Sequence, residues 1–256
     1  MLTHFSLFTG IGGIDLAAEW AGFETVGQCE FADYPTKVLE KHWPDVPRWR
    51  DVRDVTVESI RERGIEEITL LSGGFPCQPH SLAGKRQASA DERDLSGEFI
   101  RIVCETNPKW VLGENVPGLL SSEDGRFYGN FLRDLAQVGY SIGWCCFPAY
   151  AVGADFKGER VFIVAASDSV RRDCVAQNKQ IGLSDLNIEM HQERFNDKEN
   201  IPTDIYGLLT NPVCGVLRND DGVPEALDRL KCLGNAVVPQ QVYPILKAIA
   251  ERERGG

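Results

Sequence analysis

Short apolar runs alternate with longer amphipathic segments from Phe5 to about Ala166. Apolar runs of four to eight residues are typical of buried strands, and apolar positions spaced three or four apart are typical of helices. The alternation predicts βαβ units, and therefore an α/β fold with a Rossmann-like, mostly parallel sheet and helices on both faces. The expected strands are 3–8, 25–29, 49–52, 68–72 and 110–113, and the expected helices are 13–21, 34–42, 57–63 and 95–105.

The rest of this region predicts one more helix and two late strands. Apolar side chains repeat at helical spacing before Gly139, a typical helix stop. They are Phe127, Phe131, Leu132, Leu135 and Val138. The segments 140–148 and 160–165 are then predicted to form a pair of strands.

The character of the chain changes around Ser167. Residues 167–231 are polar and weakly periodic, with twelve acidic residues against eight basic ones, which is typical of a small irregular lobe or a partly disordered insertion. A final helix follows Gly234, and its apolar face needs a core to pack on. That face consists of Val242, Ile245, Leu246 and Ile249. We therefore expect a discontinuous main domain of residues 1–166 and 232–256 and a separate region at 167–231.

Composition favours a soluble protein. The chain has 256 residues, 43% of them hydrophobic, which suffices for one large domain with a substantial core. No stretch approaches the roughly 18 to 20 continuous apolar residues that cross a bilayer, and the N-terminus lacks a leader pattern. The eight cysteines include no Cys-x-x-Cys pair, which favours reduced thiols. We expect a cytoplasmic monomer with no membrane partner.

The net charge of −11 argues mildly against a nucleic-acid partner, because neutralising phosphates requires clustered Lys and Arg. It does not exclude one, since the local field in a cleft matters more than the total. Candidates for a local basic patch are Lys85, Arg86, Arg126, Lys157, Arg160, Arg171 and Arg172. Surface charge pairs explain the same residues equally well.

A glycine-rich turn, Gly10-Ile11-Gly12-Gly13, follows the first strand and opens directly into a helix. Glycines allow a tight turn, and the helix N-terminus offers free N–H groups to a ligand. The turn lacks the sequences that cradle a triphosphate, and a dinucleotide is the generic alternative. Glu30, about twenty residues later, suits the two hydroxyls of a ribose, and Asp51 suits an adenine amino group. Together these residues at the strand ends favour an adenosine-containing cofactor. The alternative is that the two carboxylates simply face solvent.

Two further strand ends carry a thiol and a carboxyl. Cys77 lies in the segment 73–79, and Glu114 begins Glu114-Asn115-Val116 after the next strand. Neighbouring strand ends share a crevice in open α/β sheets. A thiolate that adds to carbon and an acid that protonates a ring nitrogen suit covalent catalysis on an electron-deficient ring, such as a pyrimidine. The alternatives are a cysteine buried as a small apolar side chain and a solvated carboxyl.

Arg160 is expected in the same cleft, where it would favour a thiolate and bind a carbonyl oxygen. An exposed salt bridge with Glu159 or another acid is the alternative. Asn115 would act beside Glu114 or hold the cysteine loop through backbone hydrogen bonds. A zinc site built from Cys174, His191, Cys214 and Cys232 matches no known ligand spacing, so no metal is expected.

Taken in order, these motifs resemble the DNA (cytosine-5) methyltransferase family. The resemblance covers nearly everything except 167–231, and its pairing of Pro-Cys-Gln with Glu-Asn-Val is highly specific. The matching segments are Phe8-Thr9-Gly10-Ile11-Gly12-Gly13, Glu30, Asp51, Gly74-Phe75-Pro76-Cys77-Gln78, Glu114-Asn115-Val116, Glu159-Arg160-Val161-Phe162 and Gly234-Asn235-Ala236-Val237-Val238-Pro239.

The resemblance implies that S-adenosyl-L-methionine is the cofactor and that a cytosine flipped out of double-stranded DNA is methylated at C5. It implies that Cys77 adds to C6 while Glu114 holds and protonates N3, with Arg160 and Asn115 beside them. The implied cofactor-binding residues are Phe8, Gly10, Gly12, Gly13, Glu30, Phe31, Asp51, Val52, Pro76, Leu95, Asn235 and Val237. The implied DNA-binding residues are Gln78, Ser81, Lys85 and Arg86. A bacterial or phage origin and a companion restriction endonuclease would fit such an enzyme.

Three features depart from the family pattern. Ser6, in the first strand, stands where the family usually has Asp. Gly158 stands where the family usually has the first of two arginines, which leaves Arg160, with Lys157 as a candidate to compensate. The region 167–231 corresponds to the variable target-recognition region, and here it is short and acidic. Weak DNA binding, or dependence on a partner, is therefore a hypothesis.

The second candidate function is that of a tRNA methyltransferase of the same family, which the acidic charge and small size favour. Such relatives usually carry a Cys-Phe-Thr tripeptide, which Cys146-Phe147-Pro148 only approaches. A catalytically silent cofactor-binding regulator is opposed by the intact Cys77 and Glu114. A nicotinamide oxidoreductase would leave Cys77 and Gln78 unexplained.

Overall fold

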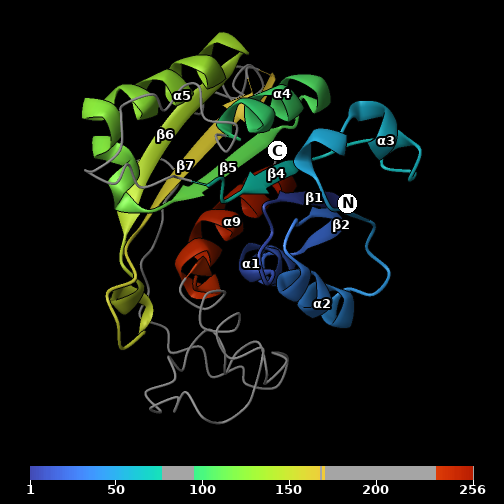
Figure 1. The fold of residues 1–256 in the computed structure, drawn as a ribbon, viewed down its shortest axis with the longest axis horizontal. Helices are drawn as coiled ribbons and strands as arrows, with labels where there is room; N and C mark the ends of the chain where they lie inside the picture. The colour runs from blue at the N-terminus through green and yellow to red at the C-terminus, as the bar shows by residue number, and fades with distance from the viewer. Residues whose placement is uncertain (77–94, 168, 171–234, 256) are drawn as a thin grey trace.

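The computed structural model describes residues 1–76, 95–167, 169–170 and 235–255. Its centre is a seven-stranded sheet with the order β3-β2-β1-β4-β5-β7-β6 (Figure 1). The strands are β1 (Leu2–Leu7), β2 (Phe23–Cys29), β3 (Arg48–Trp49), β4 (Leu70–Gly73), β5 (Trp110–Asn115), β6 (Tyr140–Phe147) and β7 (Arg160–Ser167).

The sheet is mostly parallel, as the sequence predicts. Strands β3, β2, β1, β4 and β5 pair in parallel, and only β7 runs antiparallel to its neighbours β5 and β6. The chain proceeds from β1 to β2 and β3 on one side and then crosses to β4 and β5 on the other. The carboxyl ends of β1 and β4 therefore form the switch point where open α/β sheets bind ligands.

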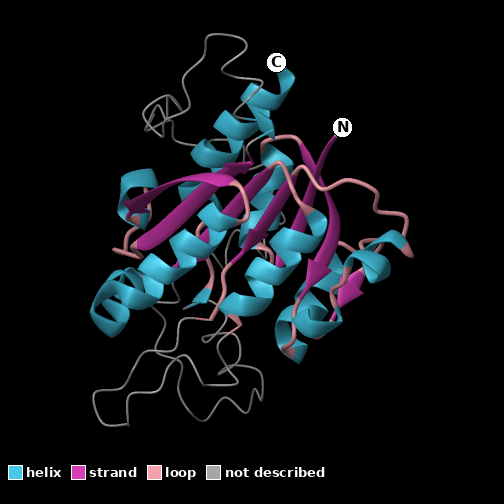
Figure 2. Ribbon diagram, turned by 90° about the horizontal axis from the view of Figure 1, so that it is seen from above, coloured by secondary structure: helices cyan, strands magenta, loops and turns pink. Residues whose placement is uncertain are grey.

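Helices cover both faces of the sheet (Figure 2). Helices α3, α4 and α5 pack on one face, α1 and α9 pack on the other, and α2 lies against α1. Their bounds are α1 (Gly13–Trp20), α2 (Asp33–His42), α3 (Val57–Arg61), α4 (Ser96–Thr106), α5 (Arg126–Gln137) and α9 (Pro239–Arg254). The described residues also include the 3-10 segments η1 (Val52–Asp54), η3 (Pro117–Gly125) and η4 (Ala149–Val152). In the described part of the chain, no helix is long and apolar enough to cross a membrane.

The strands that are buried on both faces divide their side chains between two cores. In β5, Val111 joins the core under α3, α4 and α5, whereas Trp110 and Leu112 join the core under α1 and α9. The two-residue period of a strand produces this division, and it explains why the strand reads as one continuous apolar run.

Helix α9 returns to the main domain, which confirms the prediction for the final helix. The four side chains of its apolar face are between 0 and 2% exposed and join the core that contains Ile14 and Ala17 of α1. At the far end of α9, Arg254 donates from Nη2 to the carbonyl oxygens of Ala21 and Gly22 at 3.1 Å. The C-terminal helix therefore closes the core of the first half of the chain.

Among the element boundaries that differ from the sequence-based expectation, two have a clear physical cause. The third strand has only two residues, because Asp51 caps the 3-10 turn η1 by accepting a hydrogen bond from the Arg53 amide. Strand β5 continues through Glu114 and Asn115, which pair with Phe162 and Val161 of β7. The neighbouring antiparallel strand thus extends β5 beyond its apolar run. The region 167–231 lies almost entirely outside the described residues.

Candidate functional site

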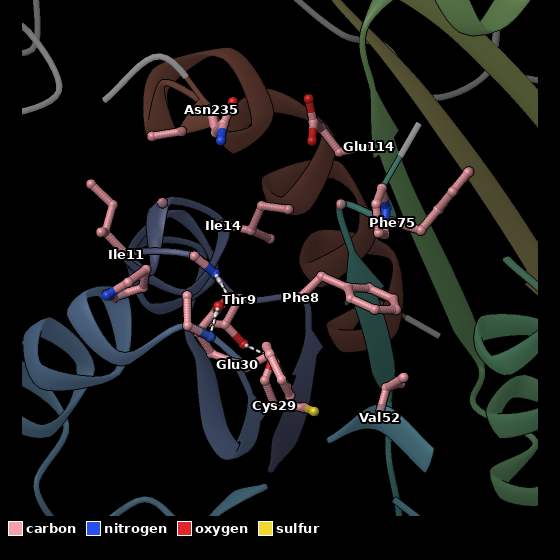
Figure 3. Close-up of a pocket in the computed structure, with 18 of the residues that line it drawn as sticks. Phe8, Thr9, Ile11, Ile14, Cys29, Glu30, Val52, Phe75, Glu114 and Asn235 are labelled. Carbon is pink, nitrogen blue, oxygen red and sulfur yellow. Dashed lines mark hydrogen bonds between the residues drawn. The ribbon is translucent and has the colours of Figure 1, made fainter. Parts of the chain in front are cut away.

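A cleft of about 1050 Å³ opens at the carboxyl ends of the parallel strands. Its walls come from the ends of β1, β2, β4 and β5, from the start of β7 and from the segment before α9. In the view of Figure 3, Glu30 and Cys29 lie on one side of the cleft, Glu114 and Asn235 lie on the other, and Phe8 lies between them. The cleft therefore joins the two groups of residues that the sequence separates into a cofactor site and a catalytic site.

The glycine turn forms one wall, and its glycines meet different requirements. Gly12 has a φ of 86°, and a Cβ there would lie 2.5 Å from the ring of Trp43. A Cβ on Gly13 would lie 2.6 Å from the carbonyl oxygen of Val237, so only glycine lets α1 approach the segment before α9. Gly10 and Gly13 line the cleft, but Gly12 does not. Gly12, which the sequence predicts at the cofactor, faces Trp43 instead of the cleft.

Glu30 is fixed by two backbone amides. Its Oε2 accepts a hydrogen bond from the amide of Gly10, and its Oε1 accepts one from the amide of Ala32, both at 2.8 Å. Two ionised oxygens offer about four acceptor positions, so about two remain for a ligand. The glycine turn and the end of β2 therefore present one oriented carboxylate at the cleft wall.

A buried polar group lies beneath this turn. Asp15 of α1 is fully buried and accepts hydrogen bonds from the Ser6 hydroxyl at 3.1 Å and from Nε2 of Gln28 at 2.9 Å. Burial raises the pKa of Asp15 to about 7, although both hydrogen bonds act to lower it. The hydroxyl at Ser6, where the family usually has a carboxyl, thus has a partner in the first turn of α1.

Apolar side chains line the other parts of the cofactor side. Phe8 adopts a φ of 51°, which is unusual for a residue other than glycine, and its ring packs on the core beside the cleft. Val52, Leu95 and Val237 also line the cleft, as expected. Phe31 lines it too, with 76% of its surface exposed.

Asp51 lies at the cleft, but part of its carboxylate is already engaged. Oδ1 accepts the Arg53 amide at 2.9 Å, and Oδ2 lies 3.3 Å from Nη1 of Arg53. The carboxylate therefore serves first as the cap of η1. It has further acceptor capacity for an amino group.

Glu114 and Arg160 form the charged centre of the other side. Nε of Arg160 lies 2.9 Å from Oε1 of Glu114, and the two side chains are only 13% and 11% exposed. Burial raises the pKa of Glu114 to about 7, and the Arg160 guanidinium acts in the opposite direction. Gly74 makes room for this carboxyl, because a Cβ there would lie 2.7 Å from Oε2 of Glu114.

Asn115 connects β5 to the segment that leads to the cysteine. Its Nδ2 donates a hydrogen bond to the carbonyl oxygen of Phe75 at 2.9 Å, and its Oδ1 accepts one from the amide of Val116 at 2.9 Å. The first of these is the backbone contact that the sequence suggests for Asn115. Pro76 lines the cleft as the last described residue before Cys77.

The structure does not place every predicted residue at the cleft. Cys77 and the four residues expected to bind DNA, Gln78, Ser81, Lys85 and Arg86, fall outside the described residues, as do those considered for zinc. Lys157, the candidate to compensate for Gly158, does not line the cleft, and its Nζ pairs with Glu159 at 2.9 Å. Arg160 therefore contacts Glu114 without help from Lys157.

Sequence reasoning missed some lining residues, among them Ile11, Ile14, Cys29, Arg50 and Ala236. Ile14 lies in the helix predicted over 13–21, but nothing in that pattern indicates that this residue also borders a cleft. The carbonyl oxygen of Ala236 accepts a hydrogen bond from Nη2 of Arg160 at 3.5 Å, and no side-chain pattern can indicate such a contact.

Comparisons with known proteins show the family of this chain. Residues 2–221 match the family model of the C-5 cytosine-specific DNA methylases. The Type II methyltransferase M.BsuFI of Bacillus subtilis is 35% identical over 239 residues, which are 89% of this chain and 53% of the relative. M.Sau96I of Staphylococcus aureus is 32% identical over 179 residues, 68% of this chain and 40% of the relative.

Among solved structures, a prophage-encoded Escherichia coli protein described as a DNA modification methyltransferase superposes with a TM-score of 0.58 at 25% identity. The match covers 67% of this chain and 48% of that one. The chain spans about half the length of the curated relatives it matches. Because the family model covers most of the sequence, the chain belongs to the C-5 cytosine-specific DNA methylase family.

Proposed function

We propose that this protein transfers a methyl group from S-adenosyl-L-methionine to C5 of a flipped cytosine in a specific DNA sequence. The observation that carries the proposal is the continuous cleft. It holds an oriented carboxylate at Glu30 on one side and the buried Glu114–Arg160 pair on the other. A methyl donor and a base bound at these two places would share one cavity.

The cofactor side fits S-adenosyl-L-methionine chemically. Glu30 retains about two acceptor positions after binding two amides, and a ribose offers two hydroxyl donors. Phe8, Val52 and Leu95 supply apolar surface for an adenine, and the glycine turn brings backbone close to the cleft. When bound, the cofactor supplies an electrophilic methyl group.

The catalytic side would act on the pyrimidine ring. Cys77 would add as a thiolate to C6, while Glu114 donates a hydrogen bond or a proton at N3 and Arg160 binds the exocyclic oxygen. Addition at C6 makes C5 nucleophilic. After methylation, a base takes the C5 proton, the C5–C6 double bond re-forms, and Cys77 leaves as a thiolate.

The ionisation of Glu114 suits this role. A carboxyl whose pKa is raised to about 7 by burial holds its proton over a pH range in which an exposed one is ionised. Arg160, at 2.9 Å, prevents the pKa from rising further, so the group remains able to exchange its proton near neutral pH.

DNA is proposed as the substrate, and residues 167–231 as a short target-recognition region set into a catalytic domain of residues 1–166 and 232–256. The short acidic region favours weak DNA binding or a partner subunit, and tRNA is the second candidate. We further propose that the protein acts as a cytoplasmic monomer, with a companion restriction endonuclease as a candidate partner.

Expression in a host free of cytosine methylation, followed by base-resolution mapping of 5-methylcytosine in DNA and RNA, tests activity, substrate and target sequence together. The wild type should yield 5-methylcytosine at one DNA sequence. Cys77→Ala should abolish it while leaving cofactor binding intact, and Cys104→Ala, an exposed cysteine in α4, should leave it unchanged. Methylation by the Cys77→Ala variant would exclude the covalent route, and methylation confined to RNA would exclude DNA as substrate.

A further inference from the structure

The connection between β6 and β7 is held by contacts beyond the strand ladder. The last strand pair is Phe147 with Arg160. The next residue, Pro148, has no amide hydrogen, so it cannot donate to continue the backbone ladder. Farther along the connection, the amide of Ala149 donates to the carbonyl oxygen of Lys157 at 2.8 Å.

A side chain from α9 bridges the two arms at this point. Gln241, which is 1% exposed, donates from Nε2 to the carbonyl oxygen of Phe147 and to that of Gly158, both at 2.8 Å. The two carbonyl groups belong to opposite arms of the connection. One buried side-chain amide thus connects the two arms of the connection.

The arm that Gln241 holds leads directly to Arg160. Gly158 has a φ of 40°, and a Cβ there would lie 2.5 Å from the ring of Phe156 and 2.9 Å from Cβ of Ala149. A glycine has wide backbone freedom, so contacts from elsewhere must fix the direction of the chain at this residue. The hydrogen bond from Gln241 is such a contact, two residues before Arg160.

The same C-terminal segment also contacts the guanidinium itself. Nη2 of Arg160 lies 3.5 Å from the carbonyl oxygen of Ala236, three residues before α9 begins. The segment from Ala236 to Gln241 therefore contacts both the backbone that precedes Arg160 and the end of its side chain. Arg160 in turn contacts Glu114 at 2.9 Å.

We propose that Gln241 is a positioning residue, which holds the start of β7 so that Arg160 meets Glu114 in the orientation that the reaction requires. The inference rests on the proposed function, in which Glu114 and Arg160 act on the base. Gln241 touches neither of them, and it acts through the Gly158 carbonyl group.

The test compares Gln241→Met, which keeps the volume and removes the donor, with Gln240→Met as a matched control. Gln240 is adjacent in α9 and also buried, at 7% exposure, and its Oε1 has no hydrogen-bond partner. Three quantities are measured: methyl transfer in a single turnover across pH, cofactor affinity by calorimetry, and the titration of Glu114 by ¹³C NMR of the side-chain carboxyl.

Gln241→Met should slow methyl transfer by roughly 10- to 100-fold, because small displacements of catalytic groups have effects of this size. Cofactor affinity should stay within about twofold, because Gln241 lies outside the cofactor side of the cleft. The Glu114 titration, and with it the pH profile, should move to higher pH, since a displaced Arg160 lowers the pKa of Glu114 less. Gln240→Met should change none of the three quantities.

An unchanged Glu114 titration in folded Gln241→Met would overturn the proposal and leave Gln241 a purely structural residue. If Gln241→Met does not fold, Gln241→Leu carries the same test, because its side chain is of similar size and has no hydrogen-bond donor. The NMR titration needs no turnover. If the wild type transfers no methyl group but Gln241→Met still shifts the pKa of Glu114, the proposed function is refuted. The coupling of Gln241 to the Glu114–Arg160 pair is then supported.

Discussion

Nε of Arg160 and Oε1 of Glu114 lie 2.9 Å apart, in a place where both side chains are almost completely buried. Two opposing effects act on the carboxyl there. Loss of water favours its neutral form, and the neighbouring cation favours its ionised form. Burial is the larger effect, and the pKa of Glu114 is raised to about 7.

Replacing Arg160 with Met should raise the pKa of Glu114 above 7, because the burial remains and the cation is lost. A ¹³C NMR titration of the side-chain carboxyls measures this directly, with Glu114→Gln identifying the signal. Arg126→Met, an exposed arginine of α5, is the control and should leave the titration unchanged. If the Glu114 signal titrates at the same pH without Arg160, the two groups are not electrostatically coupled.

Glu114→Gln should reduce methyl transfer by about 100- to 10,000-fold, the range for loss of a general acid. The amide can still form hydrogen bonds but cannot deliver a proton. Cofactor affinity should remain close to that of the wild type, since Glu114 lies on the catalytic side of the cleft. Single-turnover assays check the rate and calorimetry checks the affinity. Glu66→Gln, an exposed position, serves as control, and a Glu114→Gln enzyme of near wild-type rate would contradict the assignment.

Glu30→Gln should weaken cofactor binding by about 10- to 100-fold, which corresponds to about 1.5–3 kcal/mol for hydrogen bonds to a charged group. The amide would turn an NH₂ group toward the amide of Gly10 or Ala32, both of which now donate to the carboxylate at 2.8 Å. Calorimetric titration with S-adenosyl-L-methionine measures the loss. Glu24→Gln, exposed on the same strand, should bind as the wild type does, and equal affinity in both variants would argue against a role for Glu30.

Leu246→Ala should lower the free energy of unfolding by about 2–5 kcal/mol, because this fully buried side chain of α9 leaves a cavity in the core shared with α1. Urea unfolding measures the change. The neighbouring Lys247 is exposed, and Lys247→Ala should alter stability by no more than about 0.5 kcal/mol. A small effect at Leu246 would mean that α9 does not pack on the core in solution.

His4→Gln should make stability less sensitive to acid. The His4 ring is fully buried between the hydroxyls of Ser72 and Thr25, and burial lowers its pKa to about 3. Between pH 6.5 and 3 the unfolded chain therefore binds a proton that the folded chain does not. The wild type loses up to about 1.4 kcal/mol per pH unit from this residue as pH falls.

Urea unfolding at several pH values checks the sign of this effect. The stability difference between wild type and His4→Gln should shrink on acidification, whereas the partly exposed His42→Gln serves as the control. Asp15 and Glu114, whose pKa values are raised to about 7, have the opposite effect, because they make the folded state more stable as pH falls. They are present in both proteins, so they cancel in the comparison. A difference that does not vary with pH would refute the assignment of a neutral His4.

The pattern of apolar residues was sufficient to predict the sheet and its helices, because strand and helix periods depend on neighbouring residues alone. It placed Asp51 at the end of a longer third strand, whereas the carboxylate instead caps η1. It ended β5 before Glu114, but pairing with β7 continues through Asn115. Both differences arise from interactions that a local pattern does not contain.

The sequence by itself determined which residue types stand at the strand ends, and so predicted a ribose-binding carboxylate at Glu30 and an acid at Glu114. Only the tertiary structure decided how those groups ionise and what holds them. Burial raises the pKa of Glu114, Gly74 leaves room for its carboxyl, and Gln241 reaches the Gly158 carbonyl group from a helix 83 residues away in the sequence. The reason is physical: residue type is local, whereas desolvation and hydrogen-bond partners depend on segments that only folding brings together.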